Sequence, residues 1–331
     1  MHINPSVPRS DPPKSSSLLP RYLAFIHTHM AYQKIVVVGP GGRLGAPLVQ
    51  ALLQSQGNHF EVTALVRSTS DYTVPPNLDS SRIRVLKEDF TDHSALVAAL
   101  SGHDAVVLAI PFGLDLLSAS QAVINAAIEA GIKRVIPSEF ESDESPLTQP
   151  LYGNKQAVRG LVKEAANEGK ITYTLIRNGI WFDVGFQIAL GFDAANKSVT
   201  LYDEGNRKFH TTTVPSVCRA IVSILANPTK FVNTVVHIHD FFVTQQDILA
   251  VVERVTESKF TVTNVDMEVL GKTSLEALMR GEFTFPNLAG VIKASIWGKE
   301  SAARWDENDD SAAVGLGDAN LEEEIKKVLG I

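Results

Sequence analysis

Two residue types with known proton chemistry occur together in the stretch Tyr152-Gly153-Asn154-Lys155. A lysine that is partly withdrawn from water can donate or accept a proton near neutral pH. The stretch lies in a predicted helix, Gln149–Gly169, which follows an apolar run of strand length, Lys133–Pro137. Ligands of parallel sheets bind beyond the carboxyl ends of the strands. We therefore predict that Lys155 is a general acid or base, although a lysine on a helix is more commonly a solvent-exposed charge.

The spacing of these two side chains differs from a familiar catalytic pair. Short-chain dehydrogenases use Tyr-x-x-x-Lys, which is one position longer than the interval between Tyr152 and Lys155. Tyr152 is therefore predicted to be a structural or substrate-lining residue rather than the proton donor.

A glycine-rich segment indicates what such a lysine could act on. The apolar run Ile35–Val38 is followed at once by Gly39, Gly42 and Gly45, and leucines then recur at helical spacing. A strand, a glycine turn and a helix N-terminus in this order cradle a dinucleotide pyrophosphate. A glycine-rich loop is more often only a turn, but the flanking patterns favour the dinucleotide. The predicted loop contacts are Gly39, Gly42, Arg43, Leu44 and Gly45.

The second apolar run selects the kind of dinucleotide. Phe60–Val66 ends in Arg67, and no carboxylate follows until Asp71. NAD-binding folds place an acidic residue at about this point to hold the ribose hydroxyls, whereas a guanidinium suits a 2′-phosphate. We therefore predict NADP(H) with Arg67 on the phosphate; the alternative is a solvated arginine at a strand end.

Further cofactor contacts are expected where later strands end. The loop after Ile83–Lys87 would lie near the adenine, and the end of Asp104–Ile110 would border the nicotinamide half. Ser138 follows the next strand, where its hydroxyl could face the nicotinamide or equally cap a turn. The additional predicted cofactor contacts are Asp89, Phe90, Ala109, Pro111, Ser138, Lys155 and Asn178.

Aromatic side chains cluster in the same regions and could line a substrate pocket, although such aromatics are more often core. The predicted pocket residues are Phe112, Phe140, Tyr152, Trp181, Phe182 and Phe186. His237 and His239 share one face of a strand, but a third metal ligand is not within sequence reach, so a metal site is disfavoured.

Strand-length apolar runs alternate with helical patterns between residues 33 and 178, which predicts an α/β fold with a doubly wound parallel sheet. The expected strands are Ile35–Val38, Phe60–Val66, Ile83–Lys87, Asp104–Ile110, Lys133–Pro137 and Thr172–Arg177. Residues 1–32 are predicted to be a disordered extension. Residues 179–331 are predicted to form a smaller substrate-binding lobe interwoven with the sheet, and within it Lys208–Thr212 is expected to be an edge strand.

Composition excludes several classes of protein. The formal net charge is −7 and no block of Lys and Arg is present, which disfavours a nucleic-acid partner. No apolar run approaches the ~20 residues that span a bilayer. The single cysteine, Cys218, excludes an internal disulfide framework and fits a reducing compartment. We expect a cytoplasmic protein that is a monomer or a homodimer and acts on a small molecule.

Five segments together resemble the NmrA-like, isoflavone-reductase-like branch of the atypical short-chain dehydrogenases. They are GPGGRLG, LVRS, KRVIPSEF, the lysine Lys155 on the following helix, and YTLIRNG. The resemblance spans roughly Gln33 to Val265. It implies that Gly39, Gly42 and Gly45 hold the pyrophosphate of NADPH, that Arg67 holds the 2′-phosphate, and that Lys155 is the general acid or base in a hydride transfer.

The resemblance also implies a substrate class and leaves alternatives open. Reductases of this family act on aromatic natural products such as phenylpropanoids and isoflavonoids. Here Pro40 and Gly41 replace the usual second Gly and Thr of the first loop, and SEF continues as ESDES. These departures favour a different aromatic or conjugated secondary metabolite. The alternatives are an NAD(P)-sensing regulator without catalysis and a non-redox isomerase or dehydratase on the same fold.

Overall fold

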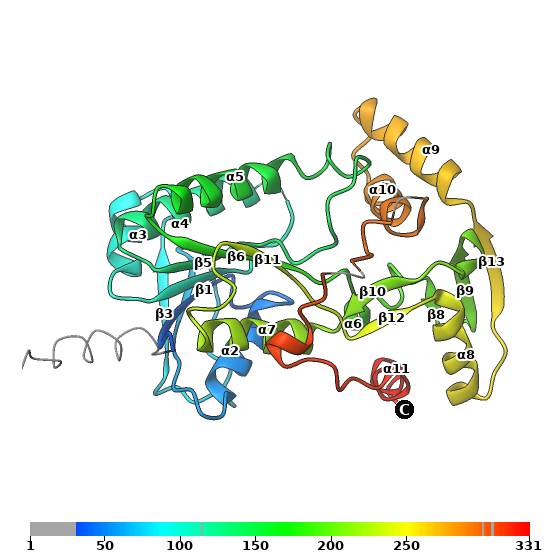
Figure 1. Cartoon of the computed structure of the whole chain (residues 1–331), viewed down its shortest axis with the longest axis horizontal. Coiled ribbons are helices and arrows are strands. Elements are labelled where there is room, and N and C mark those ends of the chain that lie inside the picture. The colour runs from blue at the N-terminus through cyan, green and yellow to red at the C-terminus, as the bar shows by residue number, and fades with distance from the viewer. Residues whose placement is uncertain (1–30, 114, 300, 306–307) are drawn as a thin grey trace, which may run out of the picture.

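The computed structural model describes residues 31–331 except residues 114, 300, 306 and 307. The predicted extension, residues 1–32, lies outside the described residues apart from its last two. The described chain forms a large α/β unit and a smaller lobe beside it (Figure 1).

The larger unit is built on a seven-stranded sheet in the described part of the chain. Its spatial order is β11-β6-β5-β4-β1-β2-β3, and every neighbouring pair is parallel. The strands are β1 (Lys34–Val38), β2 (Glu61–Arg67), β3 (Ile83–Glu88), β4 (Ala105–Leu108), β5 (Arg134–Ile136), β6 (Thr172–Arg177) and β11 (Thr234–His237). The predicted doubly wound α/β fold is confirmed.

Helices cover both faces of this sheet, and side chains alternate between them along each strand. The odd-numbered residues Ile35 and Val37 of β1 pack with α2 (Gly45–Gln54) and α7 (Val214–Ala226). Their neighbours Val36 and Val38 face the other three helices. Those helices are α3 (His93–Leu100), α4 (Leu116–Glu129) and α5 (Gly153–Asn167). In Figure 1 they lie above the sheet and α2 and α7 lie below it.

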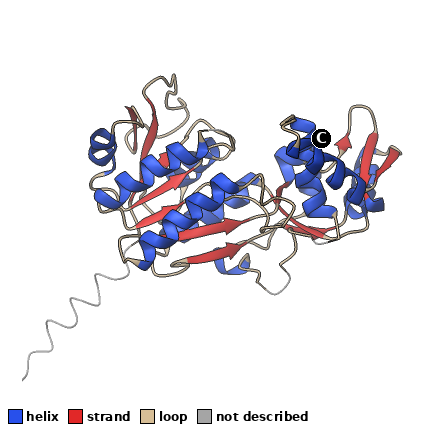
Figure 2. Cartoon of the chain, turned by 90° about the horizontal axis from the view of Figure 1, so that it is seen from above, coloured by secondary structure: helices blue, strands red, loops and turns tan. Residues whose placement is uncertain are grey.

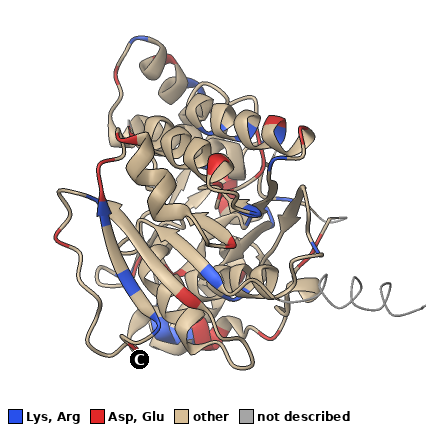
Figure 3. Cartoon of the chain, turned by 90° about the vertical axis from the view of Figure 1, so that its left-hand side faces the viewer, with Lys and Arg blue, Asp and Glu red and all other residues tan. Residues whose placement is uncertain are grey.

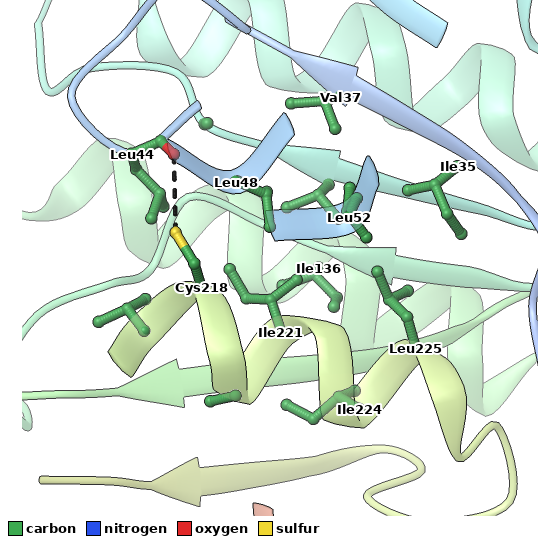
Figure 4. Packing of buried hydrophobic residues seen from close by; sticks show 14 of the residues in the cluster. Ile35, Val37, Leu44, Leu48, Leu52, Ile136, Cys218, Ile221, Ile224 and Leu225 are labelled. Carbon is green, nitrogen blue, oxygen red and sulfur yellow. Dashed lines mark hydrogen bonds between the residues drawn. The ribbon is translucent and has the colours of Figure 1, made fainter. Parts of the chain in front are cut away.

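The contact between α2 and α7 is an apolar seam (Figure 4). Leu48 and Leu52 of α2 meet Ile221 and Leu225 of α7, and each is essentially fully buried. Cys218 lies at one end of the seam, with its Sγ 4.0 Å from the carbonyl oxygen of Leu44. The seam therefore joins the helix that follows the glycine loop to a helix contributed by the second half of the chain.

The second half of the chain also contributes to the main sheet. Strand β11 pairs with β6 through the register Val235 to Leu175, so the sheet takes an outer strand from beyond the predicted boundary at residue 178. The strands of the sheet point toward the lobe (Figure 2), so their carboxyl ends face it.

The smaller lobe combines two three-stranded sheets with helices. Its strand orders are β12-β10-β7 and β13-β9-β8. The strands are β7 (Ile180–Trp181), β8 (Phe192–Asp193), β9 (Ser198–Tyr202), β10 (Phe209–Thr212), β12 (Phe241–Val243) and β13 (Thr261–Val265). The helices are α6 (Phe182–Gly185), α8 (Gln245–Thr256), α9 (Met267–Met279), α10 (Phe285–Trp297) and α11 (Leu321–Leu329), with the short 3₁₀ turn η1 (Asp203–Gly205). A second 3₁₀ turn, η2 (Ala312–Val314), packs against α7 of the larger unit.

One strand of the lobe lies in a different position from the one predicted. The expected edge position of Lys208–Thr212 is wrong, because β10 is the central strand between β12 and β7. Its residues are accordingly all buried. The lobe has its own apolar core, whose buried residues lie between Phe182 and Ile325 in the sequence.

Side chains cap the starts of α3 and α8. The side chain of Asp92 accepts a hydrogen bond from the backbone N–H of Ala95 at the start of α3. At the start of α8, Thr244 and Asp247 form a reciprocal capping box.

Candidate functional site

A cleft of about 730 Å³ opens at the carboxyl ends of β1, β2 and β4. Its floor is the glycine loop, and its sides come from the segments that follow β2 and β4. Of the predicted cofactor contacts, those that line it are Gly39, Gly42, Arg67, Phe90, Ala109 and Pro111. Phe112, predicted for the substrate pocket, also lines this cleft.

The glycine loop is folded tightly against the end of β4. Gly39 has a φ of +80°, and a Cβ placed there would lie 2.6 Å from the carbonyl oxygen of Ala109. A Cβ on Gly45 would lie 2.0 Å from the carbonyl oxygen of Gly39. Both distances are shorter than any normal contact, so these two positions admit only glycine. Gly42 meets no such overlap, and its predicted task of admitting a phosphate stays a prediction.

Arg67 lies at the mouth of the cleft with an acidic partner. One of its guanidinium nitrogens, Nη1, is 3.5 Å from Oδ2 of Asp115, and both side chains are largely exposed, at 69% and 80%. Asp115 lines the cleft as well, together with the hydroxyl residues Thr69 and Ser70. The guanidinium is therefore accessible to an anion in the cleft.

Several predicted contacts do not line the cleft, and two of them have structural tasks instead. The hydroxyl of Ser138 donates to the carbonyl oxygen of Leu108 at 2.7 Å and accepts from the N–H of Ile110 at 2.9 Å. This ties the end of β5 to the end of β4. Leu44 is buried in the core beside α7.

Asp89 and Asn178 are also turned to local partners. The Asp89 carboxylate accepts from the backbone N–H and the hydroxyl of Thr91, which lowers its pKa below the ordinary value. Asn178 is fully buried at the end of β6, where its amide donates to the carbonyl oxygen of Gly179. Arg43 is exposed beside the loop without lining the cleft.

A second cavity of about 190 Å³ lies beyond the ends of β5 and β6, under α10. The residues that line it are Phe140, Glu141, Ser142, Asp143, Thr148, Tyr152, Gly179, Ile180, Trp181, Ile292, Ser295 and Ile296. The ring of Tyr152 meets the ring of Phe112 edge to face, with the centroids 5.9 Å apart. Since Phe112 lines the first cleft, this aromatic pair lies between the two spaces.

Two of the predicted pocket aromatics lie elsewhere. Phe182 and Phe186 are buried in the core of the lobe, where Phe182 packs edge to face on Phe241 and Phe186 stacks on Phe192. Neither lines the cleft or the second cavity, because both rings are buried in the apolar core of the lobe. Phe140, Tyr152 and Trp181 line the second cavity, and Phe112 lines the neighbouring cleft.

Lys155 lies in the first turn of α5, which begins at Gly153 rather than at the predicted Gln149. The preceding residues instead form hydrogen-bonded turns, including one from Leu151 to Thr148. The ammonium Nζ of Lys155 is 2.6 Å from Oε2 of Glu141, and the two side chains are only 11% and 10% exposed. It also lies 5.4 Å from the ring centroid of Tyr152.

This ion pair belongs to a buried charged network that sequence reasoning missed. Arg177 at the end of β6 lies 2.9 Å from Glu139 and 3.1 Å from Glu141, and Arg159 of α5 contacts Glu139 as well. Burial raises the pKa of Glu141, although Lys155 and Arg177 oppose the shift. Burial also raises the pKa of Tyr152, so its hydroxyl stays protonated near neutral pH. The available signal was positional, since Glu139 and Glu141 follow β5, Arg177 ends β6 and Lys155 lies in the first turn of α5.

The two histidines of the β11 segment are paired with separate carboxylates. His237 lies 2.9 Å from Asp143, and His239 lies 3.3 Å from Asp309. Among the described residues, no group of three or more His, Cys, Asp or Glu side chains is placed to hold a metal ion.

Comparison with known proteins identifies the family. The family model described as NmrA-like matches residues 31–301, most of the chain. The chain belongs to the NmrA-like family. A curated relative, oxidoreductase aprR of Aspergillus flavus, is 29% identical over 253 residues, which cover 75% of this chain and 82% of the relative.

Solved structures support the same fold for this NmrA-like protein. A crystal structure of isoflavone reductase matches with a TM-score of 0.72 at 24% identity, covering 89% of this chain and 99% of that chain. The binary complex of leucoanthocyanidin reductase with NADPH from Vitis vinifera has the same TM-score at 17% identity, covering 89% and 99%. Within the described residues, no helix has the length and apolar character needed to cross a membrane.

The distribution of charged residues and the shape of the two cavities bear on the kind of ligand that the protein binds. In the view of Figure 3, positions of Lys and Arg are interspersed with those of Asp and Glu. The small cavity beside α10 and the larger cleft are, by contrast, concave and partly apolar in lining. Both observations favour a small-molecule ligand over a highly charged polymer.

Proposed function

We propose that this NmrA-like protein is an NADPH-dependent reductase of an aromatic or conjugated secondary metabolite. The observation that carries the proposal is the junction of the two spaces. A glycine-floored cleft with a guanidinium at its mouth adjoins an aromatic cavity through the contact between Phe112 and Tyr152. The name of the relative aprR as an oxidoreductase, and the reductases among the structural neighbours, support the same reading.

The cleft fits the phosphates of such a cofactor. Gly39 and Gly45 allow the loop to fold closely against the end of β4, and the positive end of the α2 dipole, which follows the loop, would favour the charge of the pyrophosphate. Arg67 would hold the 2′-phosphate, after giving up its exposed ion pair with Asp115. Bound there, NADPH would supply a hydride to the substrate.

The chain's own residues would orient the substrate and manage its proton. Phe140, Tyr152 and Trp181 would pack against an aromatic ring in the second cavity. Lys155, paired with Glu141 beside this cavity, would supply the proton that balances the charge developing on the substrate's heteroatom. The buried network around Glu139 and Arg177 would keep both groups in place.

The test of the cofactor assignment is an affinity measurement. We expect tighter binding of NADPH than of NADH, and we expect Arg67→Ala to remove most of that preference. A charge-assisted hydrogen bond contributes about 1.5–3 kcal/mol, so NADPH affinity should fall roughly tenfold to a hundredfold while NADH affinity changes little. Arg219→Ala is the control, because Arg219 is an exposed arginine paired with Asp318 away from the cleft. Equal affinities in the parent protein would defeat the assignment.

The alternative function is an NAD(P)-sensing regulator without catalysis. One observation favours it: the ammonium of Lys155 is held in a buried ion pair and does not line either cavity. Incubation with NADPH and a panel of conjugated aromatic ketones separates the two functions, since a sensor would bind NADPH without oxidising it. Products formed with deuterated NADPH would reveal an isomerase or dehydratase, because such a reaction leaves no deuterium in the product.

A further inference from the structure

The cavity proposed for the substrate is lined by one member of the Lys155–Glu141 ion pair. Glu141 is among the residues that line this cavity, whereas Lys155 lines neither space. The backbone of Glu141 is fixed where β5 and β6 end, because its carbonyl oxygen accepts from the N–H of Asn178 at 3.0 Å. A single parallel bridge to Arg177 holds the same segment. The position of the carboxylate is therefore set by the sheet and not by a loose loop.

The two oxygens of Glu141 have different partners. Oε2 accepts from Nζ of Lys155 at 2.6 Å, and Oε1 accepts from Nη1 of Arg177 at 3.1 Å. Arg177 also lies 2.9 Å from Glu139, which has a further cation in Arg159. The charge of Arg177 is thus shared between two carboxylates. Lys155 is the nearer partner of Glu141, and its ammonium group is the one that can give up a proton.

The environment allows this carboxyl group to hold a proton. Burial raises the pKa of Glu141 and the neighbouring carboxylate of Glu139 acts in the same direction, while Lys155 and Arg177 act against it. Other titratable and charged groups surround Lys155 and Glu141. They come from α5, from β6 and β11, and from the segment after β5. These groups are Glu139, Asp143, Glu144, Tyr152, Arg159, Arg177 and His237.

We propose that Glu141 is the group that gives the proton to the substrate, with Lys155 behind it as the source of that proton. This inference rests on the proposed reductase function. It assigns the contact with the substrate to Glu141, a residue to which the resemblance to reductases gives no role. Tyr152, whose ring centroid lies 5.4 Å from Nζ of Lys155, lines the same cavity as Glu141.

The step balances without any further reactant. The acceptor carbon of the substrate gains a hydride, with its two electrons, from the bound NADPH, and the π electrons of the reduced double bond move to the heteroatom. The heteroatom takes a proton from the Glu141 carboxyl group as Glu141 takes one from the Lys155 ammonium. The products are the reduced substrate, NADP⁺, a Glu141 carboxyl group that has regained its proton and a neutral Lys155 amine, which then takes a proton from water.

The experiment compares three carboxylate variants. Glu141→Gln keeps an acceptor for Lys155 but cannot carry the proton, and general acid catalysis contributes about 10²–10⁴-fold. We therefore expect kcat to fall at least about a hundredfold with KM and NADPH affinity nearly unchanged, and Glu141→Asp to recover part of the loss. Glu144→Gln is the matched control, because Glu144 lies 2.9 Å from Arg159 of the same network but is 48% exposed and lines neither cavity. It should change kcat by less than about threefold.

Two further readouts distinguish the possible failures. A kcat of Glu141→Gln within about threefold of the parent, with Lys155→Met inactive, would overturn the inference and leave the reductase function standing, since Lys155 would then act directly. A parent protein that oxidises no NADPH with any acceptor overturns the proposed reaction itself. Infrared titration of the carboxyl stretch does not need turnover: we expect a protonated-carboxyl band that disappears in Glu141→Gln and persists to higher pH in Lys155→Met. Absence of that band at every pH at which the protein is folded would overturn the inference.

Discussion

The guanidinium of Arg67 and the carboxylate of Asp115 form an ion pair at 3.5 Å across the mouth of the glycine-floored cleft. Arg67 ends β2 and Asp115 immediately precedes α4, so the pair links the segments after two strands that are not neighbours in the sheet. A phosphate that binds Arg67 must compete with Asp115. The pair therefore opposes binding of an anionic ligand to the same guanidinium.

Asp115 and a bound phosphate would compete for the guanidinium of Arg67. Asp115→Asn removes the competing charge, so NADPH affinity should rise while NADH affinity stays the same. Exposed ion pairs contribute only ~0–1 kcal/mol, so the gain should be no more than about fivefold. The effect should shrink at high salt, because the charges are screened. Calorimetric titration at low and high salt measures both, and a loss of NADPH affinity in this variant would show that Asp115 supports the ligand instead.

A pair of glycines with nearly the same backbone angle separates two causes of destabilisation. Gly39 and Gly57 have φ values of +80° and +81°, but a Cβ at Gly57 would meet nothing within 4 Å. Gly57→Ala should cost only the conformational term of roughly 1–2 kcal/mol, which lowers Tm by a few degrees. Gly39→Ala adds the overlap with Ala109, so its Tm should fall at least twice as far and its NADPH binding should be lost. Similar melting curves for the two variants would mean that the loop is not tightly packed on β4.

The glycine loop and Arg67 could be predicted because their signals are local. A buried strand, a turn that needs glycine and a helix with leucines at helical spacing follow one another directly in the chain. The position of Arg67 at the cleft could be predicted for the same reason, since it ends a clearly bounded apolar strand. Its contact with a 2′-phosphate stays a prediction. In both cases the position depends on residues that are close together in the sequence.

The charged network could not be predicted because its contacts join distant residues. Arg177 meets Glu141 across 36 positions, and nothing within either segment indicates the partner. In the sequence, the run of acidic residues after Phe140 is only a departure from related reductases, although the side chain of its first residue, Glu141, is 10% exposed and pairs with Lys155. The positions of Phe182 and Phe186 were missed for another reason: the segment has no regular period, so the direction of its side chains is set by the lobe.

The stability that the protein loses as the pH falls should depend on Asp104. Its carboxylate accepts from the N–H groups of Gln33 and Lys34 and lies 2.7 Å from Nζ of Lys133. Burial raises its pKa, but these hydrogen bonds outweigh burial and hold the pKa below the ordinary value. A carboxyl group with a lowered folded pKa stabilises the fold above its unfolded pKa of about 4, and that contribution is lost as pH falls through the folded pKa.

Asp104→Asn should therefore lower Tm at pH 7 and lose this difference in acid. Lys133 is well exposed, so the expected cost at pH 7 is about 1 kcal/mol, or a Tm lower by a few degrees. Melting curves of both proteins between neutral pH and about pH 3 measure the difference. Asp318→Asn is the control, because that carboxylate is 75% exposed and should leave Tm nearly unchanged. A Tm difference that persists unchanged below about pH 3 would rule out the electrostatic explanation.

Cys218 offers a probe of the coupling between the cofactor loop and the second half of the chain. Its Sγ contacts the carbonyl oxygen of Leu44, the residue that precedes Gly45, from within the seam between α2 and α7 (Figure 4). Burial raises the pKa of the thiol to about 12. Since the thiolate is the reactive form, a thiol reagent at neutral pH should modify Cys218 only when the seam opens.

We expect NADPH to slow this modification. A ligand that binds only the closed protein lowers the open population by a factor of 1 + [L]/Kd, which is about a hundredfold at a ligand concentration of 100 Kd. The measurement is the labelling rate with and without NADPH, with Cys218→Ser as the background. The same NADPH concentration should protect Arg67→Ala less, because its affinity is lower. A rate that NADPH leaves unchanged would mean that α7 separates from α2 without disturbing the glycine loop, and the seam would then be a structural contact without influence on the cofactor cleft.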